Sequence, residues 1–329
     1  MRAPQLQDAF GGSAELQKLG ECLPGVLASS RAISTTKAYR QAYQKWKTWT
    51  DRFAHVLCIP ASPDQFALYL IHLGQTAASV SVLKLACSSI AWAHRMAGLP
   101  SPTHSSLVSE TLAGLMFQLA RPKVPKEPFT LQHLHTLMVQ ADHACLTDMR
   151  NVALMVLAFF GFFRFQEVVL LRASNITFFP SHLEILVEKS KTDQLRQGNV
   201  VVVSRMSTFC PVGFLNSYMV LAGVSAGSPR LLFRRVVATT SGKYLSPKEV
   251  PLSYSNVRDL VKTKAVLLGL DPALFGTHSL RAGGSTVSAN SGVSDRLFQR
   301  HGRWATASAK DGYIKDNLDA RLSVTKRMV

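Results

Sequence analysis

Residues 301–314 read HGRWATASAKDGYI, in which Trp304 stands nine positions before Tyr313. Most tyrosines in globular proteins pack their ring and hydrogen-bond their hydroxyl, so this tyrosine alone indicates little. Upstream, residues 276–284 read GTHSLRAGG and contain a His-x-x-Arg pair, and an arginine and a lysine suited to binding phosphate stand earlier still. This order of basic residues, tryptophan and tyrosine suggests phosphoryl-transfer chemistry on DNA.

The composition supports a nucleic-acid partner. The 329 residues include 37 Lys and Arg against 20 Asp and Glu, which gives a formal net charge of +17. A hydrophobic content of 47% over this length allows a sizeable core, excludes disorder as the dominant state and favours two domains. A chain this basic is expected to bind a polyanion. A basic membrane-surface protein is the competing interpretation, but it would need a membrane-binding helix or a lipidation signal, and neither is found.

Cysteine usage and apolar runs indicate the compartment. The five cysteines are scattered, without a CxxC pair or zinc-ligand spacing, so we expect a reducing environment and no metal site. The N-terminus lacks a secretory signal pattern, and the longest apolar run, residues 152–163, is too short to span a bilayer. We therefore expect a soluble intracellular protein without a membrane segment.

The first part of the chain predicts a flexible arm followed by a helical DNA-binding domain. Residues 1–30 are rich in glycine and are expected to be only partly ordered. From Ser34, aromatic residues recur at helical spacing, with basic residues on the other faces. Such a helix suits a DNA backbone, although an ordinary solvated basic face is the alternative. The candidate DNA-binding residues on it are Lys37, Arg40, Lys45 and Lys47.

Three further helices complete the predicted domain over residues 31–120, at residues 60–73, 79–96 and 105–119. Residues 121–128 then combine three prolines with three basic residues, which is typical of an extended, charged linker. Lys123 and Lys126 in this linker are further candidates for DNA contact. The second domain is assigned to residues 129–329.

The second domain is predicted to be mostly helical with a small antiparallel β-sheet. A long apolar helix ends at Arg164, and a guanidinium at the end of such a run needs an anion. Glu167 can supply it as a structural partner, or the arginine can await a phosphate. Alternating residues 182–188 and the β-branched run 199–203 predict a hairpin with a basic tip. The remaining helices are predicted at residues 210–222, 255–268, 279–290, 294–300 and 307–314.

His278 and Arg281 are spaced to share one face near the start of a helix, with Thr277 as a candidate cap. Backbone N–H groups, the helix dipole and the arginine fork together favour a phosphate there. The small residues 282–285 predict close packing of this helix against a neighbour.

These motifs resemble those of the tyrosine recombinase, or phage integrase, family. The family's site contains an Arg-x-x-Glu segment, a hairpin lysine, a His-x-x-Arg box, a His or Trp, and a C-terminal tyrosine. The resemblance covers Ser34 to the C-terminus, and the Gly-Arg-Trp wording resembles recombinases of eukaryotic mobile elements. The matching residues are Arg164, Lys191, His278, Arg281, Trp304 and Tyr313.

Some positions depart from the family pattern. Many members have Gly-His where this chain has Arg303-Trp304, so His301 is kept as a supporting candidate. Lys189 is a rival to Lys191. The Arg-x-x-Glu segment contains Phe and Gln in its middle, which changes packing more than charge.

The resemblance implies a role for each matched residue. Tyr313 attacks a DNA phosphodiester and forms a 3′-phosphotyrosine, so neither ATP nor another cofactor is needed. Two arginines, Arg164 and Arg281, stabilise the charge on the phosphate without a metal. His278 helps to remove the phenolic proton, and Lys191 protonates the departing 5′-hydroxyl. Trp304 lies beside the phosphate, and Glu167 orients Arg164.

The expected function is therefore site-specific recombination or integration of double-stranded DNA, by a homo-tetramer assembled on DNA and without a small-molecule substrate. Residues 318–329 are expected to dock on a neighbouring protomer. Two alternatives stay open: a domesticated DNA-binding protein that does not cleave, and a type IB topoisomerase-like enzyme that nicks and reseals. If the host is eukaryotic, the protein is expected in the nucleus.

Overall fold

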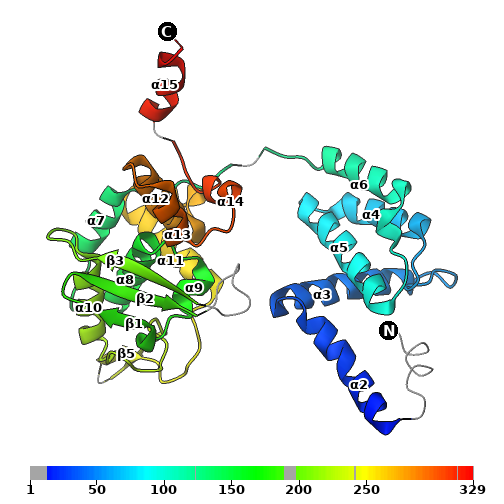
Figure 1. Cartoon of the computed structure of the whole chain (residues 1–329), viewed down its shortest axis with the longest axis horizontal. Helices are drawn as coiled ribbons and strands as arrows, with labels where there is room; N and C mark the ends of the chain where they lie inside the picture. Colours follow the sequence, from blue (N-terminus) through cyan, green and yellow to red (C-terminus); the bar gives the residue numbers. More distant parts are fainter. Residues whose placement is uncertain (1–12, 123, 189–197, 241, 317, 329) are drawn as a thin grey trace. The chain divides into compact units, whose positions relative to one another are not determined.

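The computed structural model describes residues 13–122, 124–188, 198–240, 242–316 and 318–328. The chain divides into two compact units, Met1–Lys123 and Val124–Val329, and the predicted linker at residues 121–128 contains this division. The predicted class, mainly helical with a small antiparallel sheet, is confirmed (Figure 1). The two units, called the N-terminal and the C-terminal unit below, each have a hydrophobic core of their own.

The N-terminal unit is a helical bundle. Serine side chains accept hydrogen bonds from backbone N–H groups at the start of several helices, which is why these helices begin where they do. The described elements are α2 (Ala14–Ser29), α3 (Ile33–Thr50), α4 (Pro63–Thr76), α5 (Val80–Ala97), η1 (Pro102–His104) and α6 (Ser106–Gln118).

Trp46 of α3 is the centre of the core of the N-terminal unit. Its ring is fully buried against Phe66 and Tyr69 of α4, and its Nε1–H donates to the carbonyl of Cys58 at 2.8 Å. The aromatic spacing that predicts this helix therefore marks its inward face. Helices α3 and α5 pack together, as do α4 and α6.

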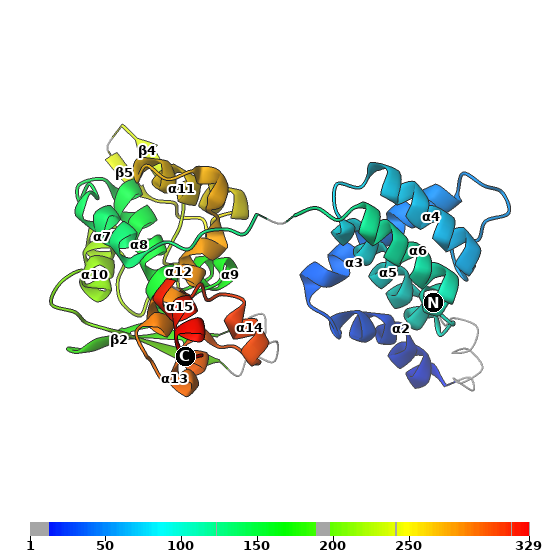
Figure 2. The same cartoon turned by 90° about the horizontal axis from the view of Figure 1, so that it is seen from above.

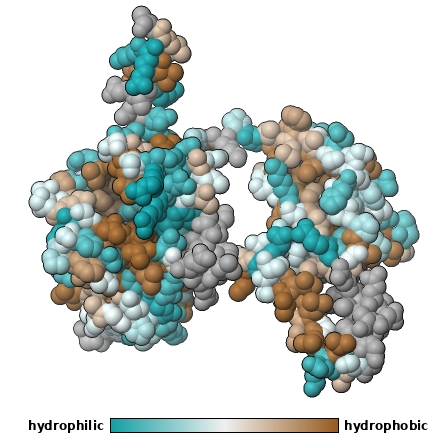
Figure 3. Space-filling model, viewed as in Figure 1, coloured by the Kyte–Doolittle hydropathy of each residue, from teal (hydrophilic) through white to brown (hydrophobic). Residues whose placement is uncertain are grey.

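Helix α2 differs from the expectation of a partly ordered arm at residues 1–30. Ser13 accepts a hydrogen bond from the N–H of Leu16, and the segment after it is rich in good helix formers. None of its residues is buried, and its exposed apolar side chains are visible in Figure 3. Local propensity and capping thus outweigh the glycines at positions 20 and 25.

The C-terminal unit surrounds the apolar helix α8 (Leu146–Phe160), of which ten residues are buried. Its helices are α7 (Leu131–Val139), α9 (Phe165–Val169), α10 (Pro211–Leu221), α11 (Tyr254–Leu267), α12 (Thr277–Asn290), α13 (Asp295–Gly302), α14 (Ala307–Asp311) and α15 (Leu318–Lys326), with the short turns η2 (Ala173–Asn175) and η3 (Pro272–Leu274). Helices α7, α10 and α12 pack directly on α8.

An antiparallel sheet covers one side of α8, and α11 lies on the opposite side (Figure 2). Its strands, in the order β1-β2-β3, are β1 (Ile176–Phe178), β2 (His182–Val187) and β3 (Asn199–Ser204). Glu184 pairs with Val202 in the β2–β3 register. A second sheet, β4 (Val236–Thr239) with β5 (Gly242–Leu245), was not predicted from the sequence.

Candidate active site

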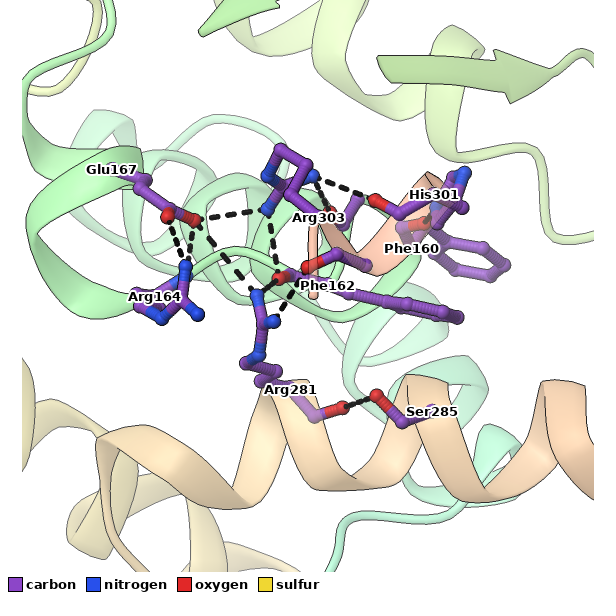
Figure 4. A network of polar contacts seen from close by, with 10 residues as sticks. Phe160, Phe162, Arg164, Glu167, Arg281, Ser285, His301 and Arg303 are labelled. Carbon is purple, nitrogen blue, oxygen red and sulfur yellow. Dashed lines mark hydrogen bonds and ion pairs between the residues drawn. The ribbon is translucent and has the colours of Figure 1, made fainter. Parts of the chain in front are cut away.

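A single buried carboxylate, Glu167 on α9, binds arginines from different parts of the C-terminal unit (Figure 4). Its Oε1 accepts from Nη1 of Arg164 at 2.8 Å, and its Oε2 accepts from Nη2 of Arg303 at 2.9 Å. Nη1 of Arg281 lies 3.9 Å from Oε2. Three positive charges therefore surround one negative charge, which leaves an excess of two.

The start of α9 explains how Arg164 is placed. Arg164 has extended backbone angles and immediately precedes the helix, while Glu167 stands in the first turn. The Glu167 carboxylate accepts from the backbone N–H of Arg164 at 2.9 Å, as the acidic residue of a capping box does. The same carboxylate thus caps the helix and holds the arginine side chain.

Arg281, on α12, is fully buried. Nη2 donates to the carbonyl of Gly302 at 2.6 Å, and Nη1 donates to the carbonyl of Phe162. Its guanidinium carbon lies 4.7 Å from the centre of the Trp304 ring and 4.8 Å from the centre of the Tyr313 ring. The arginine is therefore held between the loop after α8 and the aromatic residues of the C-terminal segment.

Two glycines bring α12 close enough to α8 for these contacts. A Cβ atom at Gly283 would lie 2.2 Å from the carbonyl oxygen of Phe129, and one at Gly284 would lie 2.1 Å from that of Phe159. Neither distance is compatible with a side chain. The small residues predicted to allow close packing have this role, and Gly276, instead of Thr277, is the residue that precedes the helix.

Trp304 and Tyr313 lie side by side after α13. Their ring centres are 5.8 Å apart, and Trp304 is buried while Tyr313 is half-buried. A Cβ atom at Gly302 would lie 1.8 Å from the Trp304 ring, so only glycine permits this position of the indole. The rings of Trp304 and Tyr313 therefore both lie against the guanidinium of Arg281.

The backbone around Tyr313 is fixed from two directions. The Thr286 hydroxyl, on α12, donates to the carbonyl of Tyr313 at 3.3 Å and accepts from the N–H of Lys315 at 3.1 Å. Lys310, on α14, is buried and pairs with Asp295 at the start of α13. The tyrosine is therefore attached to α12, and α14, the helix just before it, is attached to α13.

His278 stands in the first turn of α12 and is exposed. The centre of its ring lies 6.2 Å from the centre of the Tyr313 ring. The structure therefore brings His278, Arg281, Trp304 and Tyr313 together, with Arg164 linked to them through Glu167.

Comparison with known proteins finds similar sequences. An integrase/recombinase XerD homologue of Selenomonas ruminantium is 27% identical over 293 residues, which cover 88% of this chain and 83% of that protein. The Cre recombinase of Escherichia phage P1 is 22% identical over 307 residues, 90% of this chain and 87% of that protein. No protein-family model matches the chain.

Solved structures share the fold. XerH site-specific recombinase bound to a palindromic difH substrate, in a post-cleavage complex, aligns with a TM-score of 0.60, 14% identity, and coverage of 86% of this chain and 76% of that one. A lambda integrase dimer bound to a COC′ core site aligns with a TM-score of 0.57, 15% identity, and coverage of 92% and 96%. In sequence and in fold, the chain resembles members of the tyrosine recombinase family. Members of this family are enzymes that transfer DNA strands.

Arg303 is a residue of the candidate site that was not predicted from the sequence. It is buried, and besides Glu167 it contacts the carbonyls of Gly161 at 3.1 Å, Phe162 at 3.0 Å and His301 at 2.8 Å. The only signal in the sequence was its position directly before Trp304, where many family members have glycine.

His301, kept as a supporting candidate, is directed at the C-terminal end of α8 (Figure 4). Its Nε2 lies 2.8 Å from the carbonyl of Phe160, and its ring packs edge-on against Phe162. Burial lowers the pKa of His301, and the charges of Arg303 and Arg281 lower it further, although the hydrogen bond to Phe160 opposes them. A neutral imidazole that donates to this carbonyl supports the loop after α8.

Burial also shifts the pKa values of Arg281 and Glu167. It lowers the pKa of Arg281, and the charges of Arg164 and Arg303 lower it further, while Glu167 raises it. Burial alone would raise the pKa of Glu167, but Arg303 and Arg164 together bring it below the ordinary value. Because a guanidinium keeps its proton at neutral pH, the site holds its excess positive charge.

Lys191 and its rival Lys189 lie outside the described residues, as does Lys123. Strands β2 and β3 do form the predicted hairpin on either side of the two lysines. The assignment of Lys191 as the general acid, with Lys189 as its rival, therefore stays a prediction.

The candidate DNA-binding residues on α3 differ in their surroundings. Lys37, Arg40 and Lys45 are exposed, whereas Lys47 forms an ion pair with Asp51 at 2.8 Å. Lys126 donates to the carbonyl of Ala273 in the C-terminal unit.

No group of three or more His, Cys, Asp or Glu side chains within the described ranges has the arrangement of a metal site. In the same ranges, the helices are too short or too polar to cross a membrane.

Proposed function

We propose that this protein is a site-specific DNA recombinase or integrase that cleaves and rejoins double-stranded DNA through a 3′-phosphotyrosyl intermediate, without metal or ATP. The observation that carries the proposal is the excess of two positive charges among the three arginines around Glu167, one of which, Arg281, contacts the ring of Tyr313. A buried excess of charge is unfavourable unless an anion compensates it. A DNA phosphate is the anion that the basic chain is suited to bind.

Unpaired donors at the site support a phosphate ligand. In the described part of the chain, buried side-chain donors without a partner include Nε–H of Arg281, Nε1–H of Trp304 and the hydroxyl of Thr277. Buried donors normally have partners, and losing one is costly. Arg281 and Trp304 both lie against the Tyr313 ring, so phosphate oxygens that enter there would supply acceptors.

The chemistry follows from this placement. The Tyr313 oxygen attacks phosphorus and forms a new P–O bond, and the bond from phosphorus to the 5′-oxygen breaks. His278 takes the phenolic proton and Lys191 supplies a proton to the 5′-oxygen, so charge balances without a cofactor. Arg164 and Arg281 stabilise the negative charge that develops on the non-bridging oxygens. Attack by another 5′-hydroxyl reverses the step and joins strands.

Assembly as a homo-tetramer on DNA is part of the proposal. A groove of about 920 Å³ lies between β3, α12 and α13, and it is lined mainly by apolar side chains such as Phe160, Val202 and Leu297. Figure 3 shows hydrophobic residues gathered on the same face of the C-terminal unit. Helix α15 carries exposed Leu318, Leu322 and further apolar residues. We assign α15 of a second copy as the occupant of this groove.

Covalent trapping tests the proposed function. Purified protein is incubated with nicked duplexes of randomised sequence and is then denatured. The DNA that stays attached to the denatured protein is sequenced. The proposal predicts adducts from the wild-type protein and none from Tyr313→Phe, with salt-sensitive DNA binding kept in both. Binding without adducts in the wild type would favour the DNA-binding protein that does not cleave.

A further inference from the structure

Arg303 occupies a backbone position that does not favour arginine. It follows α13 directly, with φ of 56° and ψ of 42°, in the left-handed region. Glycine is the usual residue where a helix ends in this conformation, because it has no Cβ atom. The backbone thus offers no reason for an arginine here, and the reason must lie in the side chain.

The side chain is fixed on the loop that carries the site. Nη1 donates to the carbonyls of Gly161 and His301, and Nη2 donates to the carbonyl of Phe162. The carbonyl of Phe162 also accepts from Arg281. Arg303 therefore ties the end of α13 to the loop after α8 and shares an acceptor with the buried arginine of the His-x-x-Arg pair.

Arg303 also decides how Glu167 is used. Oε2 of Glu167 accepts from Nη2 of Arg303 and from the backbone N–H of Arg164, both at 2.9 Å. Nη1 of Arg281 is 3.9 Å away, too far for a hydrogen bond. With Oε2 occupied in this way, Glu167 does not form a close pair with Arg281, whose guanidinium stays against Trp304 and Tyr313.

We propose that Arg303 is a positioning residue for strand cleavage, which acts through Glu167 to orient Arg164 and to keep Arg281 available for the phosphate. This role rests on the proposed function. It explains why a third arginine, which stands over the Phe163 ring, is buried in a site that needs two. Glu167 is then the shared partner through which the loss of Arg303 affects Arg164 and Arg281.

The role predicts a pH dependence that a purely structural contact would not produce. Among the described residues, the charged groups around Glu167 are Arg164, Arg281 and Arg303, and Arg172 and Glu188 line the 270 Å³ cleft on which it also borders. Without Arg303, burial raises the pKa of Glu167, because its strongest charge partner is gone. Protonated Glu167 no longer pairs with Arg164, so the defect should grow as the pH falls.

The test compares Arg303→Gln and Arg303→Lys with Arg296→Gln, which replaces an exposed arginine on α13, by the initial rate of adduct formation on randomised nicked duplexes. We expect Arg303→Gln to be slower than Arg296→Gln by about tenfold at about pH 8 and by more at about pH 5.5. Arg303→Lys, which keeps the charge, should recover part of the loss at the lower pH. DNA binding should be equal in all variants.

A second arm tests the route through Glu167. In a Glu167→Gln background, Arg303→Gln should have little further effect on the adduct rate, because the shared partner is already lost. Equal rates for Arg303→Gln and Arg296→Gln, or additive losses in the double variant, would overturn the role alone. Absence of adducts from the wild-type protein would overturn the proposed function and this role with it.

Discussion

The Thr286 hydroxyl bridges the backbone on both sides of the candidate nucleophile: it donates to the carbonyl of Tyr313 at 3.3 Å and accepts from the N–H of Lys315 at 3.1 Å. Thr286 belongs to α12, the helix that also carries Arg281. One short side chain thus fixes the distance between the arginine and the segment of the tyrosine. Lys315 extends this attachment through its ion pair with Glu127 at 2.6 Å.

Thr286→Val should slow the formation of covalent adducts by about two- to tenfold, the range expected when one net hydrogen bond is lost. Valine keeps the shape of the side chain but cannot bridge the two backbone groups. Thr286→Ser is the matched control, since it keeps the hydroxyl and should retain most of the rate. Initial rates at saturating DNA provide the measurement, and a Val variant as fast as the Ser variant would contradict the prediction.

Glu167→Gln should destabilise the C-terminal unit by about 3–5 kcal/mol, because three arginines lose the one carboxylate they share. Denaturant titration of the full chain measures this effect. The Tyr313→Phe variant serves as a control with an intact Glu167, and its unfolding free energy should stay near that of the wild type. An unchanged midpoint in Glu167→Gln would show that the charges are compensated elsewhere.

The same carboxylate predicts how stability depends on pH. The folded-state pKa of Glu167 lies below the ordinary value of 4.5, because Arg303 and Arg164 outweigh burial. A group whose pKa is depressed by folding stabilises the fold above its unfolded value and loses this contribution as the pH falls through the folded value. The difference in Tm between wild type and Glu167→Gln should therefore shrink as the pH falls below about 4.5. A constant difference down to about pH 3 would contradict the assignment.

Gly284→Ala should destabilise the C-terminal unit by about 1–3 kcal/mol, because the new Cβ atom would meet the backbone oxygen of Phe159 on α8. Gly114→Ala, on α6 and with open space around it, is the control and should leave this transition unchanged. Thermal unfolding followed by circular dichroism distinguishes the two. Equal Tm values for both variants would mean that α12 and α8 are not in close contact.

Removal of residues 318–329 should leave DNA binding by single protomers intact but reduce higher assemblies on DNA, since α15 would no longer fill the groove of a neighbour. Leu297→Asp, which places a charge in the groove itself, should have the same effect from the other side of the contact. Light scattering of the protein–DNA complexes measures the assembly. Unchanged assembly in both variants would exclude this contact between protomers.

Much of the fold could be predicted because its helices carry local signals. Ser62, Ser105 and Thr130 cap α4, α6 and α7, and apolar periodicity marks the inward faces. The β4–β5 hairpin was missed because its strands are short and mostly exposed, so they lack the alternation that identifies a strand.

The site was predictable where motifs carry it and not where long-range contacts do. Arg281, Trp304 and Tyr313 were predicted because they match motifs of the tyrosine recombinase family. Arg303 reaches Glu167 across 136 positions of sequence, and its left-handed backbone is a conformation that arginine rarely adopts. No pattern in the sequence predicts such a contact, because the contact forms only when α9 and the end of α13 pack together.

The proposed function requires that the Tyr313 oxygen becomes bonded to the 3′-phosphate of cleaved DNA. The most direct measurement is mass spectrometry of peptides from trapped adducts after nuclease digestion. We predict a nucleotide attached through its 3′-phosphate to the peptide that contains Tyr313, and a free 5′-hydroxyl on the released strand. A nucleotide on any other residue, or a 5′-phosphate linkage, would contradict the claim.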